Sequence, residues 1–198
     1  MRYKIIILAT TLFCVISKPL FSEGSEDSFY SELSRRSSEV VSLNSRFTQT
    51  KQVKLLNTKV LSQGKFYYKR GGEIRFDYSS PKTMSIIMLK DKLRIETQNK
   101  ATTYDFARQP SLAELAVIME ACISGKVKEL PDKYKVSYTL LSGFHVVTIT
   151  NLKRSPDNPY TKIELHFDLD NYSLKELILF ERSEDTTYYS FYNIVANG

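Results

Sequence analysis

The chain has 198 residues, long enough for one domain with a substantial core, and it carries a formal net charge of +6 at pH 7. Three basic residues and no acidic residue lie within residues 1–22, so removal of that segment would lower the net charge from +6 to +3. A charge of +3 on the remaining chain argues against nucleic acid as a partner, although it permits a mild attraction to anionic lipid headgroups.

The first 22 residues have the features of a secretory signal peptide. A short basic head precedes twelve uncharged residues, 5–16, which are too few to span a bilayer but suit the apolar region of a signal. We expect cleavage near Ser22, with Ser17 as the alternative site. The mature chain, residues 23–198, is then predicted to be a single domain outside the cytoplasmic membrane.

Two cysteines occur in the sequence, and they do not predict a disulfide. Cys14 lies in the signal region, where Phe13 occupies a position at which a lipid-attachment motif needs a small residue. We therefore favour signal cleavage over attachment of a lipid at Cys14. Cys122 alone would remain in the mature chain, so no internal disulfide is possible there.

The mature chain is predicted to begin with a helix over residues 25–46. Phe29 and Leu33 fall near one face of this segment, with charged residues elsewhere. Serine and acidic residues at 25–28 are typical of a helix start. From Phe47 onward the apolar residues recur at every second position, which indicates strands.

Residues 46–106 show the two-residue period of strands separated by short turns. The hairpin at 64–81 places Lys69, Arg70 and two glycines at its tip, between flanks rich in Phe and Tyr. These flanks offer more aromatic surface than a solvent-facing hairpin needs, so another part of the protein covers them or a ligand binds there. The predicted strands start at Arg46 and then cover 61–69, 74–78, 84–89, 93–97 and 102–106.

A second helix is predicted at about 110–124, in the middle of the chain. Ser111 and Glu114 have the spacing of a capping box, and Gly125 stands where a helix often ends in a glycine. Glu114 and Glu120 are the charged residues of this segment. A helix that is apolar nearly all round should be covered on more than one side.

The last third of the chain returns to the strand pattern. The clearest signal is at 162–169, where polar and apolar residues alternate without a break. Consecutive hairpins form a strongly curved sheet or an open barrel, and two helices are available to cover its open side. The predicted fold class is therefore mainly β with helices (α+β), with further strands at 134–140, 144–150, 161–169, 174–181 and 186–195.

The sequence contains no motif that nominates a catalytic site. Patterns such as G-x-S-x-G, H-E-x-x-H, G-x-G-x-x-G and C-x-x-C are absent. His166 is interpreted as a surface residue and His145, beside Phe144 and Val146, as a structural one. Residues 168–171 are interpreted as a turn, since they lack the rest of a calcium loop. We therefore expect no enzyme activity, no metal site and no cofactor.

Four segments follow one another in the order and spacing of motifs from a known family. They are Phe-Thr-Gln at 47–49, Gly-Lys-Phe-Tyr-Tyr-Lys-Arg at 64–70, the strand at 74–81 and the segment at 86–93. They resemble the SFTQ-like first strand, the G-x-L-x-x-KRP turn, the FRWxYxxP strand and the IVxDGxxLW segment of the LolA family of periplasmic outer-membrane lipoprotein carriers. Gly71 replaces the proline of the KRP turn, and Phe and Tyr stand in for the family's Trp.

The resemblance implies an unclosed antiparallel β-barrel, or half-barrel, with an α-helical lid. Acyl chains of lipid-modified proteins would lie against its apolar concave face. An inner-membrane lipoprotein-releasing transporter would load them, and an outer-membrane acceptor would receive them. In the family, the arginine of the KRP turn bonds lid backbone in the free protein and is needed for client transfer. Arg70 is the matching position, and Arg75 is the competing candidate.

Candidate site residues follow from this resemblance and from the alternation within the strands. The sequence alone does not separate a hollow barrel from one that these side chains fill as an ordinary core. The candidate lid residues are Leu112, Leu115, Ile118 and Met119, and the candidate acyl-binding residues are Phe47, Phe66, Tyr68, Phe76, Tyr78, Ile86, Met88, Leu93 and Ile95.

Two functions agree best with these observations. An acceptor anchored to the outer membrane through Cys14 ranks third, because Phe13 argues against the anchor, and a secreted enzyme ranks last. The first is a monomeric periplasmic chaperone that binds the acyl chains of lipoproteins in a hydrophobic cavity and shuttles them from the inner to the outer membrane. The second is a half-barrel regulatory module that senses lipid or a stress signal and passes it to a membrane partner. We favour the carrier, because a regulator of this kind usually has a second domain.

Overall fold

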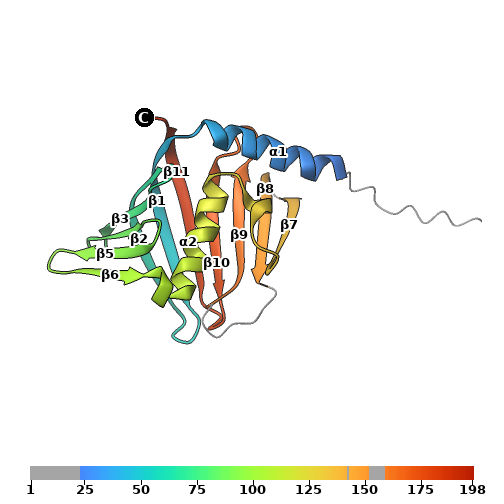
Figure 1. Ribbon diagram of the computed structural model, residues 1–198. Helices are drawn as coiled ribbons and strands as arrows, with labels where there is room; N and C mark the ends of the chain where they lie inside the picture. The colour runs from blue at the N-terminus through green and yellow to red at the C-terminus, as the bar shows by residue number, and fades with distance from the viewer. Residues whose placement is uncertain (1–22, 142, 152–158) are drawn as a thin grey trace, which may run out of the picture.

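The computed structural model describes residues 23–141, 143–151 and 159–198. The predicted signal peptide at 1–22 lies outside these residues. Two antiparallel meanders dominate the described part (Figure 1). The first comprises β1 (Ser42–Val53), β2 (Thr58–Lys69), β3 (Glu73–Ser80), β4 (Met84–Met88), β5 (Lys92–Thr97) and β6 (Ala101–Asp105), and the second β7 (Tyr134–Leu141), β8 (Phe144–Asn151), β9 (Tyr160–Asp168), β10 (Leu174–Glu181) and β11 (Thr186–Ala196).

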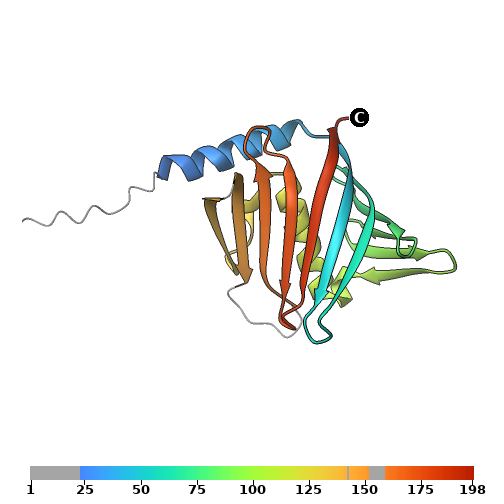
Figure 2. The ribbon, with the colours of Figure 1, turned by 180° about the vertical axis from the view of Figure 1, so that it is seen from behind.

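The two meanders join into one sheet where β1 pairs with β11, and Phe47 there lies opposite Phe191. The strand order is β6-β5-β4-β3-β2-β1-β11-β10-β9-β8-β7. Among the described residues the sheet thus has eleven strands, and its outermost members, β6 and β7, stand at opposite ends of the order. Seen from behind in Figure 2, the sheet is curved and unclosed, which confirms the predicted fold class.

The concave face is apolar because the strands alternate. In β9, Ile163, Leu165 and Phe167 are buried, whereas the residues between them are only half-buried on the convex face. The same alternation of buried and half-buried residues occurs in β3. Burial of one such large apolar side chain stabilises the fold by about 1.5–3 kcal/mol, so the pattern fixes which face turns inward.

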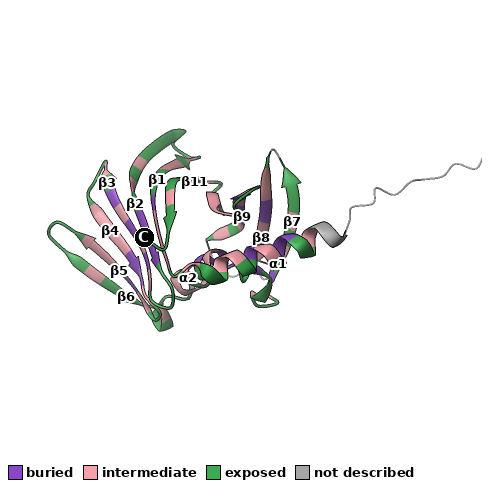
Figure 3. Cartoon of the chain, turned by 90° about the horizontal axis from the view of Figure 1, so that it is seen from above, coloured by how far each residue is buried: buried purple, intermediate pink, exposed green. Residues whose placement is uncertain are grey.

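The helix α2 (Pro110–Ile123) crosses the concave face. It carries the chain from β6 at one edge of the sheet to β7 at the other, as Figures 1 and 3 show. Its own side chains Ile118, Met119 and Cys122 are buried. A helix with so little polar surface needs cover on several sides, and the curved sheet provides that cover.

The ends of α2 differ from the prediction at one point. The helix begins at Pro110, with Gln109 as the N-cap and no side-chain capping bond, so the predicted capping box at Ser111 is wrong. Proline suits the first helical position because its fixed φ is helical and no N–H is needed there, which leaves Ser111 inside the first turn. Glu114 instead pairs with a lysine at 133, 2.5 Å away. At the other end, Gly125 takes the predicted left-handed conformation, with φ +71°.

The helix α1 (Glu23–Glu39) lies along the top of the sheet, over the second meander (Figures 1 and 3). Phe29 and Leu33 are its buried anchors, at 2% and 1% exposure. The Phe29 ring stacks on Tyr138 of β7, with centroids 4.7 Å apart, and on Tyr172 of the β9–β10 turn, at 5.8 Å. These contacts fix the N-terminal half of α1 to the second meander.

The predicted helix over 25–46 extends too far. The observed helix ends at Glu39, and β1 begins at Ser42. Leu43 fits an apolar stripe of either period, but it pairs with Tyr68 on one side and Ala196 on the other. Two ladders of backbone hydrogen bonds therefore outweigh the helical pattern at this end.

Candidate functional site

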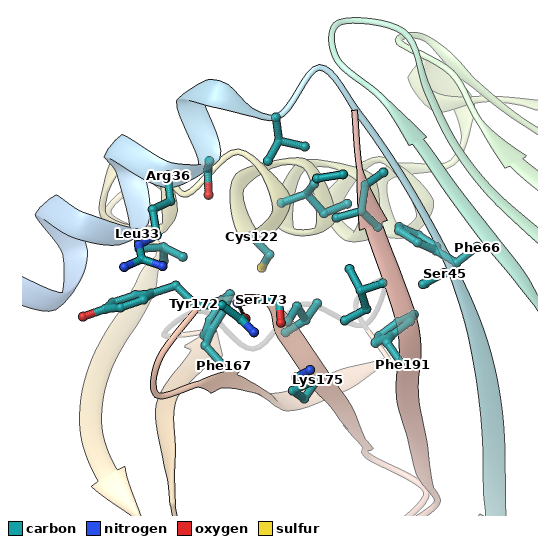
Figure 4. Close-up of a pocket in the computed structure, with 18 residues that line it drawn as sticks. Leu33, Arg36, Ser45, Phe66, Cys122, Phe167, Tyr172, Ser173, Lys175 and Phe191 are labelled. Atoms are coloured by element: carbon teal, nitrogen blue, oxygen red, sulfur yellow. Dashed lines mark hydrogen bonds between the residues drawn. The ribbon is translucent and has the colours of Figure 1, made fainter. Parts of the chain in front are cut away.

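Two open spaces lie between the concave face and the helices. The β3–β6 chamber, of about 350 Å³, is lined by β3 to β6, by α2 and by strands of the second meander. The α1 chamber, of about 380 Å³, is lined by α1, the C-terminal end of α2, β1, β2 and β9 to β11 (Figure 4). Both volumes lie within the range of roughly 300–1,000 Å³ that is typical of small-molecule sites.

The β3–β6 chamber is suited to hydrocarbon. Among the described residues that line it, every side chain is aliphatic, aromatic or a methionine. The hydroxyls of Tyr78 and Tyr189 lie 3.2 Å apart, and Gln49 Nε2 donates to Tyr189 at 3.0 Å. Burial raises the pKa of Tyr189 well above its ordinary value, so this hydroxyl stays neutral. The chamber thus offers an uncharged wall whose central hydroxyls are already paired.

The structure distributes the candidate residues over both chambers. Three of the four candidate lid residues, Leu112, Leu115 and Met119, line the β3–β6 chamber, and Ile118 packs in the core beside it. Phe66 lines the α1 chamber instead. The candidate acyl-binding residues in the β3–β6 chamber are Phe76, Tyr78, Ile86, Met88, Leu93 and Ile95.

Phe47 and Tyr68 lie beside the chambers and not on their walls. Phe47 is fully buried, with its ring centroid 5.0 Å from that of Tyr78. Gly64, opposite Phe47 on β2, leaves room for this ring, since a Cβ there would lie 2.9 Å from Phe47 Cε1. Phe47 is therefore a packing residue that contacts Tyr78 of the chamber wall.

Several lining residues escaped the sequence reasoning, which nominated only the first meander and α2. They come from β10 and β11, where apolar residues recur at every second position and could have been nominated by the same rule. The side chains of α1 gave no such signal, because nothing in the sequence places α1 over this end of the sheet. The missed residues of the β3–β6 chamber include Leu177, Leu179 and Tyr189, and those of the α1 chamber include Leu33, Val40 and Phe191.

A family model described as "Outer membrane lipoprotein carrier protein LolA" matches residues 38–198, which include both meanders and α2. The chain belongs to the LolA family. No curated protein sequence matches it.

Solved structures with a similar course of the chain include the following three. A LolA superfamily protein from Nitrosomonas europaea has a TM-score of 0.44 and 9% identity, over 85% of this chain and 94% of that one. A MucA/MucB complex from Pseudomonas aeruginosa gives 0.49 and 12%, over 88% and 58%. The lipoprotein LppX of Mycobacterium tuberculosis gives 0.37 and 8%, over 86% and 94%.

In this LolA-family chain, Arg70 holds the C-terminal end of α1. Its Nη2 donates to the carbonyl oxygens of Ser37, Ser38 and Val40 at 3.0, 2.6 and 2.5 Å. The last carbonyls of a helix lack hydrogen-bond partners within the helix and form the negative end of its dipole. The guanidinium of Arg70 donates hydrogen bonds to these carbonyls and places a positive charge at the negative end. The lid expected from the sequence is α2, whereas these hydrogen bonds go to α1.

Asn197 binds the same end of α1 from the opposite end of the chain. Its Oδ1 accepts a hydrogen bond from the Val41 N–H at 2.7 Å, and its Nδ2 donates to the Glu39 carbonyl at 3.0 Å. Its backbone N–H donates to the Ser42 carbonyl at 2.8 Å. The sequence reasoning did not nominate Asn197, although it completes the clasp around the α1 end.

Tyr68 connects Arg70 to α2. Its hydroxyl donates to Glu120 Oε1 at 3.3 Å. Burial raises the pKa of Tyr68, the Glu120 carboxylate raises it further, and the Arg70 guanidinium acts in the opposite direction. Glu120 on α2, Tyr68 on β2 and Arg70 in the β2–β3 turn therefore form a polar connection from one helix to the other in this LolA-family chain.

Arg75, the competing candidate, is engaged on the convex face. Its Nε donates to Asp77 Oδ1 at 2.8 Å, and its Nη2 to Ser85 Oγ at 3.4 Å. The Asp77 carboxylate is also the main reason why the pKa of Arg75 is raised. Arg70, and not Arg75, is thus placed to act on a helix.

Cys122 is a free cysteine that lines the α1 chamber at 1% exposure, and burial raises the pKa of its thiol. Within the described ranges, no group of three or more His, Cys, Asp or Glu side chains is arranged to hold a metal ion. In the same part of the chain, no helix is both long enough and apolar enough to cross a bilayer.

Proposed function

We propose that this protein is a periplasmic chaperone that binds the acyl chains of lipid-modified proteins and shuttles them from the inner to the outer membrane. The observation that carries this proposal is the pair of chambers left open between an aromatic-rich concave sheet and the helices. Membership of the LolA family over residues 38–198 supports the same class of ligand.

The apolar wall supplies the affinity that such a carrier needs. Each CH₂ group removed from water contributes about 0.8 kcal/mol, so one chain of about sixteen carbons gains on the order of 10 kcal/mol before ordering costs. Phe76, Ile86 and Leu93 present this wall in the β3–β6 chamber. No bond is made or broken in this process, so the protein acts by binding and not by catalysis.

Release requires that α2 compete with the client for the same surface. Leu112 and Leu115 at the N-terminal half of the helix are half-buried, whereas Met119 and Cys122 further along are buried. The N-terminal half is thus the more weakly covered part and the part that an entering acyl chain displaces most easily. When the client leaves, the same leucines return to the chamber and cover it.

The route follows from the ligand. A lipid-modified protein has to be taken from an inner-membrane lipoprotein-releasing transporter and passed to an outer-membrane acceptor, because its acyl chains do not cross water unshielded. The carrier works in the periplasm after removal of residues 1–22, as a monomeric single domain of residues 23–198. Arg70 controls the transfer of the lipoprotein by holding the C-terminal end of α1.

Native purification from the periplasm, followed by native mass spectrometry, tests the proposal. We expect the mature protein to carry a lipid-modified partner that crosslinks near α2, and to lose it when Phe76 and Leu93 are both replaced by Asp. Replacement of two outward-facing residues, Thr139 and Ser190, by Asp serves as the matched control and should retain the partner. Recovery of the protein without lipid or lipoprotein, but with an inner-membrane protein attached, would favour a regulatory module instead.

A further inference from the structure

The α1 chamber contains two hydroxyls that have no hydrogen-bond partner. Ser45 on β1 is 6% exposed, and its Oγ is buried without a partner. The Oγ of Ser173, at the end of the β9–β10 turn, is also buried without a hydrogen-bond partner. Both residues line the chamber, where Figure 4 places them on different walls. A buried hydroxyl without a partner is unfavourable, so these two positions call for an external hydrogen-bond acceptor.

Ser45 faces inward because it stands two residues before Phe47 on β1, and both are buried on the same face, with exposed Arg46 between them. The pairing of β1 with β11 shifts by one residue between Asn44 and Arg46, and Asn193 in this stretch of β11 has a φ of +53°. Such a bulge interrupts the ladder opposite Ser45 and bends β11 there. Ser173 is held by its own backbone, since its N–H donates to Asn171 at 2.9 Å and its carbonyl accepts from Asp168 at 3.0 Å.

The charges near the α1 chamber are already balanced. Arg36 Nε donates to Glu32 at 2.6 Å, and Lys175 Nζ lies 3.6 Å from an Asp168 carboxylate oxygen. Glu32 also pairs with Arg35, which in turn pairs with Glu39. Each of the two lining cations, Arg36 and Lys175, thus has a carboxylate partner, and neither calls for an anionic headgroup. The unpaired groups are neutral O–H donors, and the natural partner for a neutral donor in an apolar site is a carbonyl oxygen.

The two chambers are neighbours through pairs of aromatic rings. Phe66 of the α1 chamber and Phe76 of the β3–β6 chamber have centroids 4.9 Å apart. Phe191 and Tyr189, one from each chamber, are stacked at 6.2 Å. Rings from the two chambers are thus in direct contact, and a ligand that reaches both spaces has to displace them.

We infer that the two chambers divide one acyl ligand between them. The α1 chamber takes the ester or amide carbonyl at the head of the chain, to which Ser45 and Ser173 donate, and the β3–β6 chamber takes the hydrocarbon tail. The inference rests on the proposed function, because it assumes that the ligand is an acyl group. It adds that the protein recognises an uncharged carbonyl and orients the chain with its head beneath α1.

A matched pair of lipids tests this inference on the mature chain. Monopalmitoyl glycerol carries an ester carbonyl, whereas 1-O-hexadecyl glycerol has the same chain and headgroup without it. By displacement of a fluorescent fatty-acid probe, we expect the ester to bind at least about fivefold more tightly, the effect of one neutral hydrogen bond. The double variant Ser45→Ala with Ser173→Ala should bind both lipids equally. The control Ser190→Ala, on the convex face opposite Glu176, should keep the preference.

The outcomes separate the inference from the proposed function. Equal binding of ester and ether by the unaltered protein would overturn the carbonyl site while leaving an acyl carrier in place. Tighter binding of palmitic acid than of either lipid would replace it with a site for a carboxylate. Failure of all three lipids to bind would count against the proposed function itself. The melting temperature of the empty Ser45→Ala variant gives a second readout: a decrease would mean that the hydroxyl already has a partner.

Discussion

Arg70 and Asn197 come from distant parts of the sequence and bind the same turn of backbone. Together they satisfy the carbonyls of Ser37, Ser38 and Glu39 at the end of α1. Arg70 also lies beside the Tyr68 hydroxyl that reaches Glu120 on α2. One guanidinium therefore influences how firmly both helices are held.

Replacement of Arg70 by Leu should leave the fold intact but loosen the α1 end. Exposed hydrogen bonds of this kind contribute about 1 kcal/mol, so the melting temperature should fall by roughly 2–4 °C. We expect Arg70→Leu to retain bound lipoprotein in a transfer assay with acceptor, since the connection that returns the helices to the closed state is missing. Arg75→Leu on the convex face is the control and should release the client normally. Normal release by Arg70→Leu would remove Arg70 from the mechanism.

The sequence identified some of these residues and not others for definite reasons. Arg70 stands in a turn motif shared with a family, so local spacing was enough to nominate it. Asn197 acts across 156 residues on Val41, and no local pattern reports a contact of that range. Ser45 breaks the apolar alternation of β1, but only the three-dimensional structure shows that its hydroxyl is buried and unpaired.

Gly125, which follows the end of α2, packs directly against α1. A Cβ at this position would lie 2.8 Å from the Leu33 carbonyl oxygen and 2.9 Å from Ser34 Cα, both on α1. The φ of +71° adds a conformational demand that glycine meets without strain. The end of α2 and the middle of α1 are therefore in contact through a surface that admits no side chain.

Two glycines with nearly the same backbone conformation separate these effects. Gly71 has φ +72° with open space around it, whereas Gly125 has φ +71° and the α1 backbone beside it. We expect Gly71→Ala to destabilise the protein by about 1 kcal/mol through backbone strain alone. Gly125→Ala should destabilise it by at least twice as much in denaturant unfolding. Equal losses from both variants would show that the helix contact contributes nothing.

The anchoring of α1 on the second meander should depend on pH. His145 lies in the stack under α1, with its ring 4.7 Å from Phe29 and its Nδ1 2.9 Å from the Tyr138 hydroxyl. Burial lowers the pKa of His145, against a smaller opposing effect of the Leu169 backbone and Asp168. The folded state therefore favours the neutral ring, and its contribution to stability is fully present above the ordinary value of about 6.5 and is lost as the pH falls below it.

The difference between His145→Gln and the unaltered protein isolates this effect from the titration of carboxylates. Thermal melts between pH 7.5 and 5.5 should show that the unaltered protein loses more stability on acidification than the variant does. The physical reason is that glutamine keeps a polar contact for Tyr138 but does not take up a proton in this range. Identical pH profiles would show that His145 is equally accommodated in both protonation states.

At the scale of the whole molecule, the curved sheet was predictable and the chambers were not. Strands from residue 58 onward appear where the two-residue period predicted them, with ends shifted by up to three residues. The predicted C-terminal end of α1 was wrong, because Leu43 fits the apolar period of a helix as well as that of a strand. Whether apolar side chains fill a concave face or leave space depends on the distance between layers, and α1 sets that distance at one end by contacts such as Phe29 with Tyr138.

Cys122 reports whether the α1 chamber is closed. Its raised pKa and its 1% exposure predict slow alkylation by iodoacetamide in the folded mature protein, because only the thiolate reacts. A bound acyl ligand should slow the reaction further, and Arg70→Leu should accelerate it about fivefold by loosening α1. Mass spectrometry of the labelled protein measures the rate. A rate as fast as that of the unfolded chain would contradict a covered chamber.

The unpaired edges of the sheet affect how far the concave face can widen. A closed barrel has a girth fixed by its strand number and stagger, and it can widen only by breaking backbone hydrogen bonds. Here, among the described residues, β6 and β7 stand at opposite ends of the strand order and share no ladder. The two meanders can move apart or together through small changes of sheet twist, and such changes break no hydrogen bond between strands. The width of the concave face can thus change while every strand pairing is kept.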